Sequence, residues 1–345
     1  MGKIDYKSAG VNIKAGAEAL DKIKAQVKST HTTAVLSGLG GFGSLYDLKS
    51  VISEYKHPVL VQSIDGVGTK TIIAGMLGKF NTIGIDLLSA CANDILVMGA
   101  RPLTFLDYIA NDKLNPETIV EIVGGMVRAC RETGVSLVGG ETAEMPDTYL
   151  TGEHDLVGII TGIVEKEKII TGKSILPGDM ILGLPSSGLH TNGFSLARNL
   201  FFKIGKYSAA DTVNGLNKNI GDTLLEPHIN YTNHISSILS NGIEIKGMAH
   251  ITGGGLIENI PRILPSDCAV RINLGTWPSL PVFSIMQSLG EVEEQEMYRT
   301  FNMGIGMVLI VNPDCRAVIE ESLKDLCAVY KIGSVVPGNR TVKLN

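Results

Sequence analysis

The sequence Asp-Gly-Val-Gly-Thr-Lys, which begins at Asp65, brings a carboxylate, two glycines, a hydroxyl and an amine within six positions. The carboxylate suits Mg²⁺, a hard cation that takes oxygen ligands and binds beside substrate phosphates. Gly66 and Gly68 allow a positive φ and a close approach of backbone N–H groups to a ligand. Thr69 and Lys70 add a hydroxyl and a positive charge. These residue types predict a site for a nucleotide polyphosphate and its metal, and an ordinary Asp-Gly turn is the alternative.

A second carboxylate, Asp94, lies in a segment whose apolar residues predict a buried helix. Asp94 follows Leu87 by seven positions and Cys91 by three, so it projects from the apolar face of that helix. Burying a lone charge is costly, so this carboxylate must be paired or must coordinate a cation. Capping another element, or pairing with Arg101, is the alternative to a metal role. We expect Asp94 to complete the metal site because Asp65 already supplies half of it.

A third carboxylate, Glu141, belongs to the Gly-Gly-Glu-Thr segment of residues 139–142, directly after a predicted strand at residues 135–138. Gly140 and Thr142 flank Glu141 and give this segment the same combination of glycine, hydroxyl and acid as the first. A hairpin or crossover turn is the alternative interpretation. Three acid-bearing positions in one half of the chain predict a metal–nucleotide site more strongly than any one of them does.

The glycine-rich segment of residues 38–43 matches G-x-G-x-x-G by letter. A dinucleotide fingerprint needs its third glycine to open a crossover helix, and residues 44–48 are too few for one. We therefore interpret Gly40, Gly41 and Gly43 as a flap over phosphates, with a plain surface loop as the alternative.

In the second half, the loop of residues 186–192 reads Ser-Ser-Gly-Leu-His-Thr-Asn and joins a predicted strand to a predicted helix. Amides at a helix N-terminus beside small hydroxyls can bind an anion, and Thr191 or Asn192 could cap the helix. A lone histidine is usually structural, but His190 lies in a loop where side chains can meet ligands. The glycine run after Thr252 is explained equally well as a ligand site or as a turn.

The elements that must position these groups alternate between strand-like and helical patterns, which predicts a mixed α/β or α+β fold. Charged residues interrupt the apolar pattern near residues 165–175 and divide the chain into domains 1–170 and 171–345. The expected helices are residues 15–27, 84–98, 115–133 and 192–202, and the expected strands are residues 59–64, 103–109, 135–138, 155–164, 180–184, 307–311 and 329–335.

Composition narrows the class of protein. The net charge of −5 and the absence of a Lys/Arg block argue against nucleic acid and anionic membranes as partners. Five cysteines without C-x-x-C spacing argue against a disulfide framework and a structural zinc site. No apolar signal region opens the sequence, and its longest near-apolar run is too short to span a bilayer. We expect a cytoplasmic protein.

Nearly the whole chain resembles the phosphoribosylformylglycinamidine cyclo-ligases, also called aminoimidazole ribonucleotide synthetases. The element at Asp65 is shared across a superfamily that includes selenophosphate synthetase, thiamine monophosphate kinase and a hydrogenase maturation protein. Departures are small: Leu189 stands where many members have Pro, and Thr191 where Ser is common. The matching stretches are residues 6–11, 40–43, 65–70, 93–95, 105–108, 139–146, 186–193, 251–256 and 299–307, of which 139–146 and 299–307 are the most specific.

The resemblance implies a two-domain subunit whose N-terminal domains pair across a homodimer and close a β-barrel, with ATP near that interface. The C-terminal α/β domain would bind the substrate. The implied reaction is the ATP-dependent ring closure of formylglycinamidine ribonucleotide to aminoimidazole ribonucleotide in purine biosynthesis, with release of ADP and phosphate.

The resemblance also implies roles for individual residues. Mg²⁺ would be held by Asp65 and Asp94, with Glu141 assisting. His190 would act as a general acid/base or hold the formyl oxygen, with Asp94 and Lys70 as further catalytic residues. The residues expected to bind ATP are Gly40, Gly41, Gly43, Asp65, Gly66, Gly68, Thr69, Lys70, Asp107, Gly140, Glu141 and Thr142. Those expected to bind substrate are Ser187, Gly188, His190, Thr191, Asn192, Thr252, Gly253 and Gly254.

Two other functions fit the sequence less well. A selenophosphate synthetase would need a reactive cysteine near the glycine-rich loop, and no cysteine precedes Cys91. A catalytically silent nucleotide-binding protein would have no need for Asp65, Asp94, Glu141 and His190 together.

Overall fold

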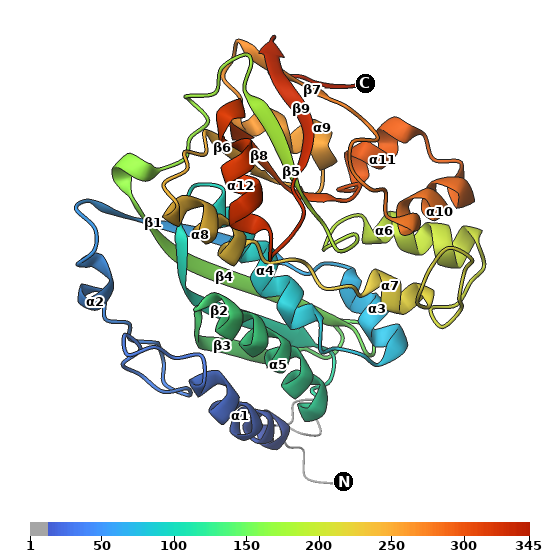
Figure 1. Ribbon diagram of the computed structural model, residues 1–345. Coiled ribbons are helices and arrows are strands. Elements are labelled where there is room, and N and C mark those ends of the chain that lie inside the picture. Colours follow the sequence, from blue (N-terminus) through green and yellow to red (C-terminus); the bar gives the residue numbers. More distant parts are fainter. Residues whose placement is uncertain (1–12) are drawn as a thin grey trace, which may run out of the picture. The chain divides into compact units, whose positions relative to one another are not determined.

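The computed structural model describes residues 13–345, which form two compact units (Figure 1). The first unit contains the described residues up to Ile95 together with Arg101–Glu167. The second contains Leu96–Ala100 and Lys168–Asn345. The mixed α/β class predicted from the sequence is confirmed. Of the stretches that carry the family resemblance, residues 6–11 lie outside the described part of the chain.

The first unit is built on a four-stranded sheet with strand order β1-β4-β2-β3. β2 and β3 pair in parallel, and β4 pairs antiparallel with both β1 and β2. The elements of this unit are α1 (Ile13–Lys28), α2 (Lys49–Ile52), β1 (Pro58–Gly66), α3 (Lys70–Leu77), α4 (Ile83–Leu96), β2 (Arg101–Asn111), α5 (Pro116–Thr133), β3 (Ser136–Glu144) and β4 (His154–Glu165).

One face of this sheet is covered by helices and the other is open. On the covered face, the Cys91 thiol of α4 donates to the carbonyl of Gly158 in β4 at 3.4 Å. On the opposite face, Ile64, Ile159 and Leu106 form one row across β1, β4 and β2. Their exposed fractions are 64%, 38% and 37%, so the row is a solvent-exposed apolar strip on the described chain. We call this side of the sheet the open face.

The second unit holds a six-stranded sheet with strand order β10-β7-β9-β5-β8-β6. Its pairings are antiparallel except for that of β10 with β7. The elements of this unit are β5 (Met180–Pro185), α6 (Phe194–Arg198), α7 (Ile220–Leu224), α8 (Thr232–Ser240), β6 (Gly247–His250), α9 (Gly255–Asn259), β7 (Cys268–Ile272), α10 (Pro281–Gly290), α11 (Glu294–Thr300), β8 (Ile305–Val311), α12 (Arg316–Leu323), β9 (Tyr330–Pro337) and β10 (Val342–Leu344).

Both faces of this second sheet are buried. In β8, Val308 and Ile310 belong to a core with α9, whereas Leu309 and Val311 belong to a core with α8 and α12. All seven residues of β8 are buried, which explains why the sequence there is a continuous apolar run rather than an alternating one.

Two segments differ from the sequence-based expectation. Residues 139–142, expected as a loop after a short strand, lie inside β3, because the strand continues through its glycines to Glu144. The helix expected over residues 192–202 is α6 followed by a π-helical turn, Asn199–Ile204. The other predicted elements are present with shifts of a few residues at their ends. Among the described residues, no helix has the length and apolarity needed to cross a bilayer.

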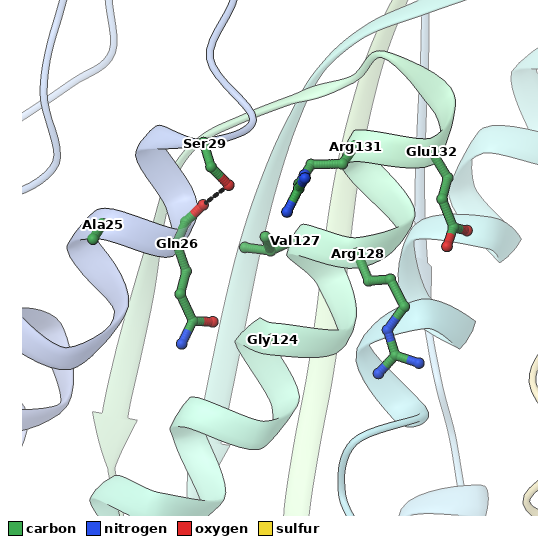
Figure 2. Close-up of a pocket in the computed structure, with 8 residues that line it drawn as sticks. All are labelled: Ala25, Gln26, Ser29, Gly124, Val127, Arg128, Arg131 and Glu132. Carbon is green, nitrogen blue, oxygen red and sulfur yellow. Dashed lines mark hydrogen bonds between the residues drawn. The ribbon is translucent and has the colours of Figure 1, made fainter.

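α4 and α5 pack with almost no space between their backbones. A Cβ added at Gly84 would lie 2.0 Å from the Ile122 carbonyl oxygen, and one at Gly125 would lie 2.8 Å from the Asn81 oxygen. The neighbouring Gly124 instead faces a surface groove between α1 and α5, where Figure 2 shows it opposite Gln26. Its added Cβ would come no closer than 3.5 Å to the Gln26 side chain.

We therefore expect Gly125→Ala to lower the free energy of unfolding by about 1–3 kcal/mol, because the helices must separate to admit the methyl group. The adjacent Gly124→Ala is the matched control. It should raise the free energy of unfolding by up to about 1 kcal/mol, because alanine has a higher helix propensity than glycine. Urea denaturation of both variants measures the difference. Equal effects would contradict the close helix packing.

Candidate active site

A cavity of about 730 Å³ runs along the β3 edge of the first sheet. Its walls come from α1, the glycine-rich loop, α5 and strands β2, β3 and β4. It gathers seven of the residues predicted to bind a nucleotide, namely Gly40, Gly41, Gly43, Asp107, Gly140, Glu141 and Thr142. Gly40 has a φ of 94°, a conformation that favours glycine.

β3 is an edge strand, and its backbone faces this cavity. The first part of its outer edge is bonded, since Leu137 donates to Thr30 Oγ1 at 3.0 Å and its carbonyl oxygen lies 2.9 Å from His31 Nε2. Within residues 13–345, no such bond reaches the outer edge of residues 139–142. Free N–H and C=O groups in a strand can pair with the ring nitrogens and amino group of a flat heterocycle.

Asp107 lies on the helix-covered face of the sheet, in register with Gly140 of β3. A Cβ added at Gly140 would lie 2.3 Å from Asp107 Oδ1, so the carboxyl group uses the space that this glycine leaves. Burial raises the pKa of Asp107 to about 7. Near neutral pH this carboxyl can therefore donate a hydrogen bond as well as accept one.

Asp65 and Asp94 come together from β1 and α4, as the sequence predicted. Burial and then the charge of Asp65 raise the pKa of the Cys91 thiol, and Asp94 adds to the shift, which places both carboxylates near one thiol. Ser63 Oγ donates to Asp94 Oδ2 at 3.1 Å, and the Gly66 amide donates to Asp65 Oδ1 at 2.7 Å. Two carboxylates and a hydroxyl are oxygen ligands of the kind that Mg²⁺ accepts.

Glu141 does not join them. Asp65, Gly158 and Asp107 occupy one row across the sheet, whereas Glu141 is paired with Tyr108, one position further along β2. Because successive side chains in a strand alternate between faces, Glu141 points to the face opposite Asp65. Across residues 13–345 no three His, Cys, Asp or Glu side chains form a metal-binding group. A three-carboxylate site is therefore not supported within one chain.

Lys70 has a different place from the one expected. Its side chain is fully buried, and its Nζ lies 2.9 Å from each carboxylate oxygen of Asp86. This placement does not support a direct contact with phosphate, because the positive charge is neutralised inside the unit. Gly68 has the expected positive φ of 64°, whereas Gly66 ends β1 and leaves room for the Leu156 carbonyl. Thr69 precedes α3 without a capping side-chain bond.

In the second unit, the loop after β5 is held by a residue that sequence reasoning missed. Asn302 is 2% exposed; its Oδ1 accepts from Ser186 Oγ at 2.9 Å, and its Nδ2 donates to the Gly188 carbonyl at 2.8 Å. The Gly304 amide donates to the same Oδ1 at 2.9 Å. Asn302 belongs to residues 299–307, one of the two stretches most specific to the family. That membership could have identified it as a candidate from the sequence.

His190 is 1% exposed and has a φ of 59°, a left-handed conformation that is rare for a residue with a side chain. Its Nε2 accepts from the Ser187 amide at 3.3 Å. A Cβ added at Gly306 would lie 2.5 Å from His190 Cε1 and 2.1 Å from the Tyr231 hydroxyl. That hydroxyl donates to the Pro185 carbonyl at 2.7 Å, which joins the start of the loop to the residue directly before α8.

The two loops predicted to bind substrate lie beside each other. Asn192 Oδ1 is 3.3 Å from the position of a Cβ added at Gly253. Asn259 holds the second loop, since its Nδ2 donates to the Gly253 and Gly255 carbonyls at 3.2 and 2.9 Å. Gly254 has a φ of 98° and precedes α9, and the Thr252 carbonyl accepts a further bond from Asn259 at 3.4 Å.

The predicted helix cap is wrong. Gly193 occupies the N-cap position of α6 with a φ of 81°, and neither Thr191 nor Asn192 caps the helix. α6 has only five residues, so it provides no long helix N-terminus for an anion. Two buried histidines next to this loop, His228 and His250, were also missed, because their contacts join segments far apart in the sequence.

Comparison with known proteins gives matches along almost the entire chain. The family model of the AIR synthase related protein, N-terminal domain, matches residues 47–164, and that of the C-terminal domain matches residues 177–344. A phosphoribosylformylglycinamidine cyclo-ligase of Thermoanaerobacter sp. (strain X514) is 49% identical, with 96% of this chain and 98% of the relative covered. The protein of that name from Geobacillus thermodenitrificans (strain NG80-2) is 50% identical, with 96% of each chain covered.

Solved structures with the same fold are more distant in sequence. Thiamine-monophosphate kinase from Stenotrophomonas maltophilia K279a has a TM-score of 0.68 at 17% identity, covering 95% of this chain and 96% of its own. Hydrogenase maturation protein HypE in complex with ATP has a TM-score of 0.66 at 18% identity, covering 97% and 92%. At this identity the likeness shows the fold.

The raised pKa of Asp107 predicts a pH-dependent stability. Its value of about 7 lies above the ordinary 3.8, so the folded state binds more protons than the unfolded state between these values. The free energy of unfolding therefore falls as the pH rises through this window. The free energy of unfolding of Asp107→Asn, minus that of the native protein, should increase by up to about 3 kcal/mol from pH 5 to pH 7. Urea denaturation at both pH values measures it. A difference that does not change with pH would contradict this.

Proposed function

The chain belongs to the phosphoribosylformylglycinamidine cyclo-ligase family, and from this premise we propose that it converts formylglycinamidine ribonucleotide to aminoimidazole ribonucleotide with ATP, releasing ADP and phosphate, in purine biosynthesis. The observation that carries the proposal is the identity of 49–50% over 96% of the chain with proteins of that name. Apart from Gly40, Gly41 and Gly43, the candidate residues of both units lie on the segments that the two family models match.

The chemical problem in this reaction is activation of a formamide oxygen, which is a poor leaving group. Transfer of a phosphoryl group to that oxygen gives an iminophosphate. The neighbouring amidine nitrogen of the same molecule then attacks the formyl carbon, and phosphate leaves. Holding the two groups in a reactive conformer contributes much of the acceleration. The protein's share is positioning and charge neutralisation, as in other phosphoryl transfers.

We assign ATP to the cavity along β3. Its volume of about 730 Å³ falls in the range of small-molecule sites. Gly40, Gly41 and Gly43 would turn backbone amides toward phosphates, and the outer edge of residues 139–142, which no residue of 13–345 pairs, would pair with the base. Asp107, which carries a proton part of the time near neutral pH, can donate to a ring nitrogen or accept from an amino group.

Asp65 and Asp94 would hold Mg²⁺. The ion usually binds through one or two carboxylates and keeps waters and substrate phosphates as its other ligands, so a site with two carboxylates fits it. Ser63 orients Asp94 through its hydrogen bond of 3.1 Å. Mg²⁺ would neutralise phosphate charge during transfer, the role that the buried Lys70 cannot fill directly.

The substrate is assigned to the loops around His190 in the second unit. Ser187, Gly188, Thr191 and Asn192 offer backbone amides, hydroxyls and an amide side chain, and Thr252, Gly253 and Gly254 extend this surface. The bare Nε2 of His190 accepts from an amide, which leaves Nδ1 as its protonated nitrogen in the neutral ring. His190 can therefore donate to the formyl oxygen.

We further propose that the protein is a cytoplasmic homodimer whose open faces pair to close a β-barrel. The exposed row of Ile64, Ile159 and Leu106 is the kind of apolar strip that monomers rarely leave uncovered. A selenophosphate synthetase or a silent nucleotide-binding protein is not favoured, because the relatives that cover the chain at 49–50% identity are named cyclo-ligases.

The reaction itself is the first test. Purified protein with formylglycinamidine ribonucleotide, Mg²⁺ and ATP should produce aminoimidazole ribonucleotide and phosphate in equal amounts. His190→Asn should lower kcat by about 10²–10⁴-fold because a proton donor is lost. Asp65→Asn should weaken Mg-ATP binding tenfold or more. The exposed Asp325→Asn is the control and should leave kcat and Mg-ATP binding unchanged. ATP consumption without the ring product would reject the cyclo-ligase assignment.

The dimer is tested separately by sedimentation at micromolar concentration. The native protein should sediment as a dimer, and Ile64→Glu should sediment as a monomer, since a charge on the open face opposes burial. Val318→Glu is the matched control, because Val318 is 51% exposed on α12 of the other unit. A native monomer, or an Ile64→Glu dimer, would exclude this interface.

A further inference from the structure

Three histidines from separate segments of the second unit form a buried row. The rings of His190 and His228 stack with centroids 4.0 Å apart and an interplanar angle of 20°. His250 continues the row, with its ring centroid 5.1 Å from that of His228. The three residues are 1%, 1% and 6% exposed, respectively. The proposed function uses only the first of them.

The contact between His228 and His250 limits where protons can lie. His228 Nε2 and His250 Nε2 are 3.0 Å apart, a hydrogen-bond distance that requires a proton on one of them and a lone pair on the other. On its other side, His228 Nδ1 lies 3.4 Å from Thr191 Oγ1. A line of exchangeable hydrogen positions therefore runs from Thr191 through His228 to His250.

The surroundings select one arrangement along this line. Asn192 Nδ2 donates to Thr191 Oγ1 at 3.4 Å, which leaves the hydroxyl proton of Thr191 for the bond to His228 Nδ1. His228 then carries its proton on Nε2 and donates it to His250 Nε2. The lone pair of His250 Nε2 accepts this bond, so His250 is the residue that receives a proton moving along the line.

Two simpler roles explain less. A metal site lacks a third ligand, since the described part of the chain holds no group of three metal-binding side chains. Simple packing would be served better by apolar rings, because each buried imidazole carries polar nitrogens that must be satisfied. Imidazole is also the side chain whose ordinary pKa lies closest to neutral pH, so it gains and loses protons readily there.

We propose that His228 and His250 are positioning residues that form a proton relay from the substrate loop. This inference rests on the proposed function, because ring closure must release a proton from the attacking nitrogen. Thr191 Oγ1 accepts that proton as its own passes to His228 Nδ1, and the Nε2 proton of His228 passes to His250 Nε2. One proton leaves the substrate, one arrives on His250, and no electrons are exchanged.

The decisive variants separate hydrogen bonding from proton transfer at His250. His250→Gln keeps an amide group at the position of Nε2 but cannot take up a proton, and His250→Leu removes both properties. We expect both variants to slow single-turnover ring closure by about tenfold or more, with the dissociation constants of substrate and Mg-ATP changed less than about threefold. His234→Asn is the matched control, a half-buried histidine beside Tyr231 and outside the row.

A His250→Gln protein that closes the ring at the native rate would overturn the relay, since hydrogen bonding alone would then suffice. Nitrogen-15 spectra of histidine-labelled wild-type protein supply a readout that needs no substrate. One of the two Nε2 atoms should be protonated, the other bare, with a coupling across the hydrogen bond. Two protonated Nε2 atoms would also overturn the relay. A wild-type protein that shows the coupling but no ring closure would overturn the proposed function instead.

Discussion

The missing side chain at a few glycines inside the strands is the constraint on which both candidate sites depend. Gly140 leaves space for the Asp107 carboxyl, and Gly306 leaves space for the His190 ring and the Tyr231 hydroxyl. Gly158 likewise leaves space for the ring of Phe105 beneath α4. Glycine weakens a strand, and it persists there where another group approaches the backbone closely. In each case the group that approaches belongs to a site or to its immediate support.

Buried charge is the second constraint, and it explains how the first unit uses Lys70. The pair with Asp86 joins the start of α3 to α4, with both side chains fully buried. Removing one partner of such a pair costs about 3–5 kcal/mol, because the remaining charge stays buried. The ion pair therefore fixes the chain directly after Asp65, and it stabilises the position of that carboxylate without touching a ligand.

Local patterns in the sequence predicted the elements well because strands such as β1 and β8 are apolar runs bounded by turn residues. The structure brings Asp65 and Asp94 close to the same Cys91 thiol, and each was singled out in the sequence because it is a carboxylate on an apolar element. Glu141 shows where such reasoning fails. A difference of one position in the pairing of two strands sends a side chain to the opposite face, and no local pattern encodes that register.

The histidine row shows a different limit. His228 and His250 are 22 positions apart, and His228 meets His190 on one side and His250 on the other only through the tertiary fold. The sequence carries no periodicity that relates them. Asn302, which braces the loop after β5, was within reach because it lies in a stretch that marks the family, although its bonds to Ser186 and Gly188 required the structure.

The open edge of β3 has a consequence for the behaviour of the protein in concentrated solution. An edge strand whose backbone groups are not paired by the described residues is a template on which another chain can add a strand and begin to aggregate. Residues 139–142 oppose this, because glycines have low strand propensity and Glu141 adds a charge that a second identical edge would repel. The composition that leaves the edge open to a small planar molecule thus also discourages fibril-like association.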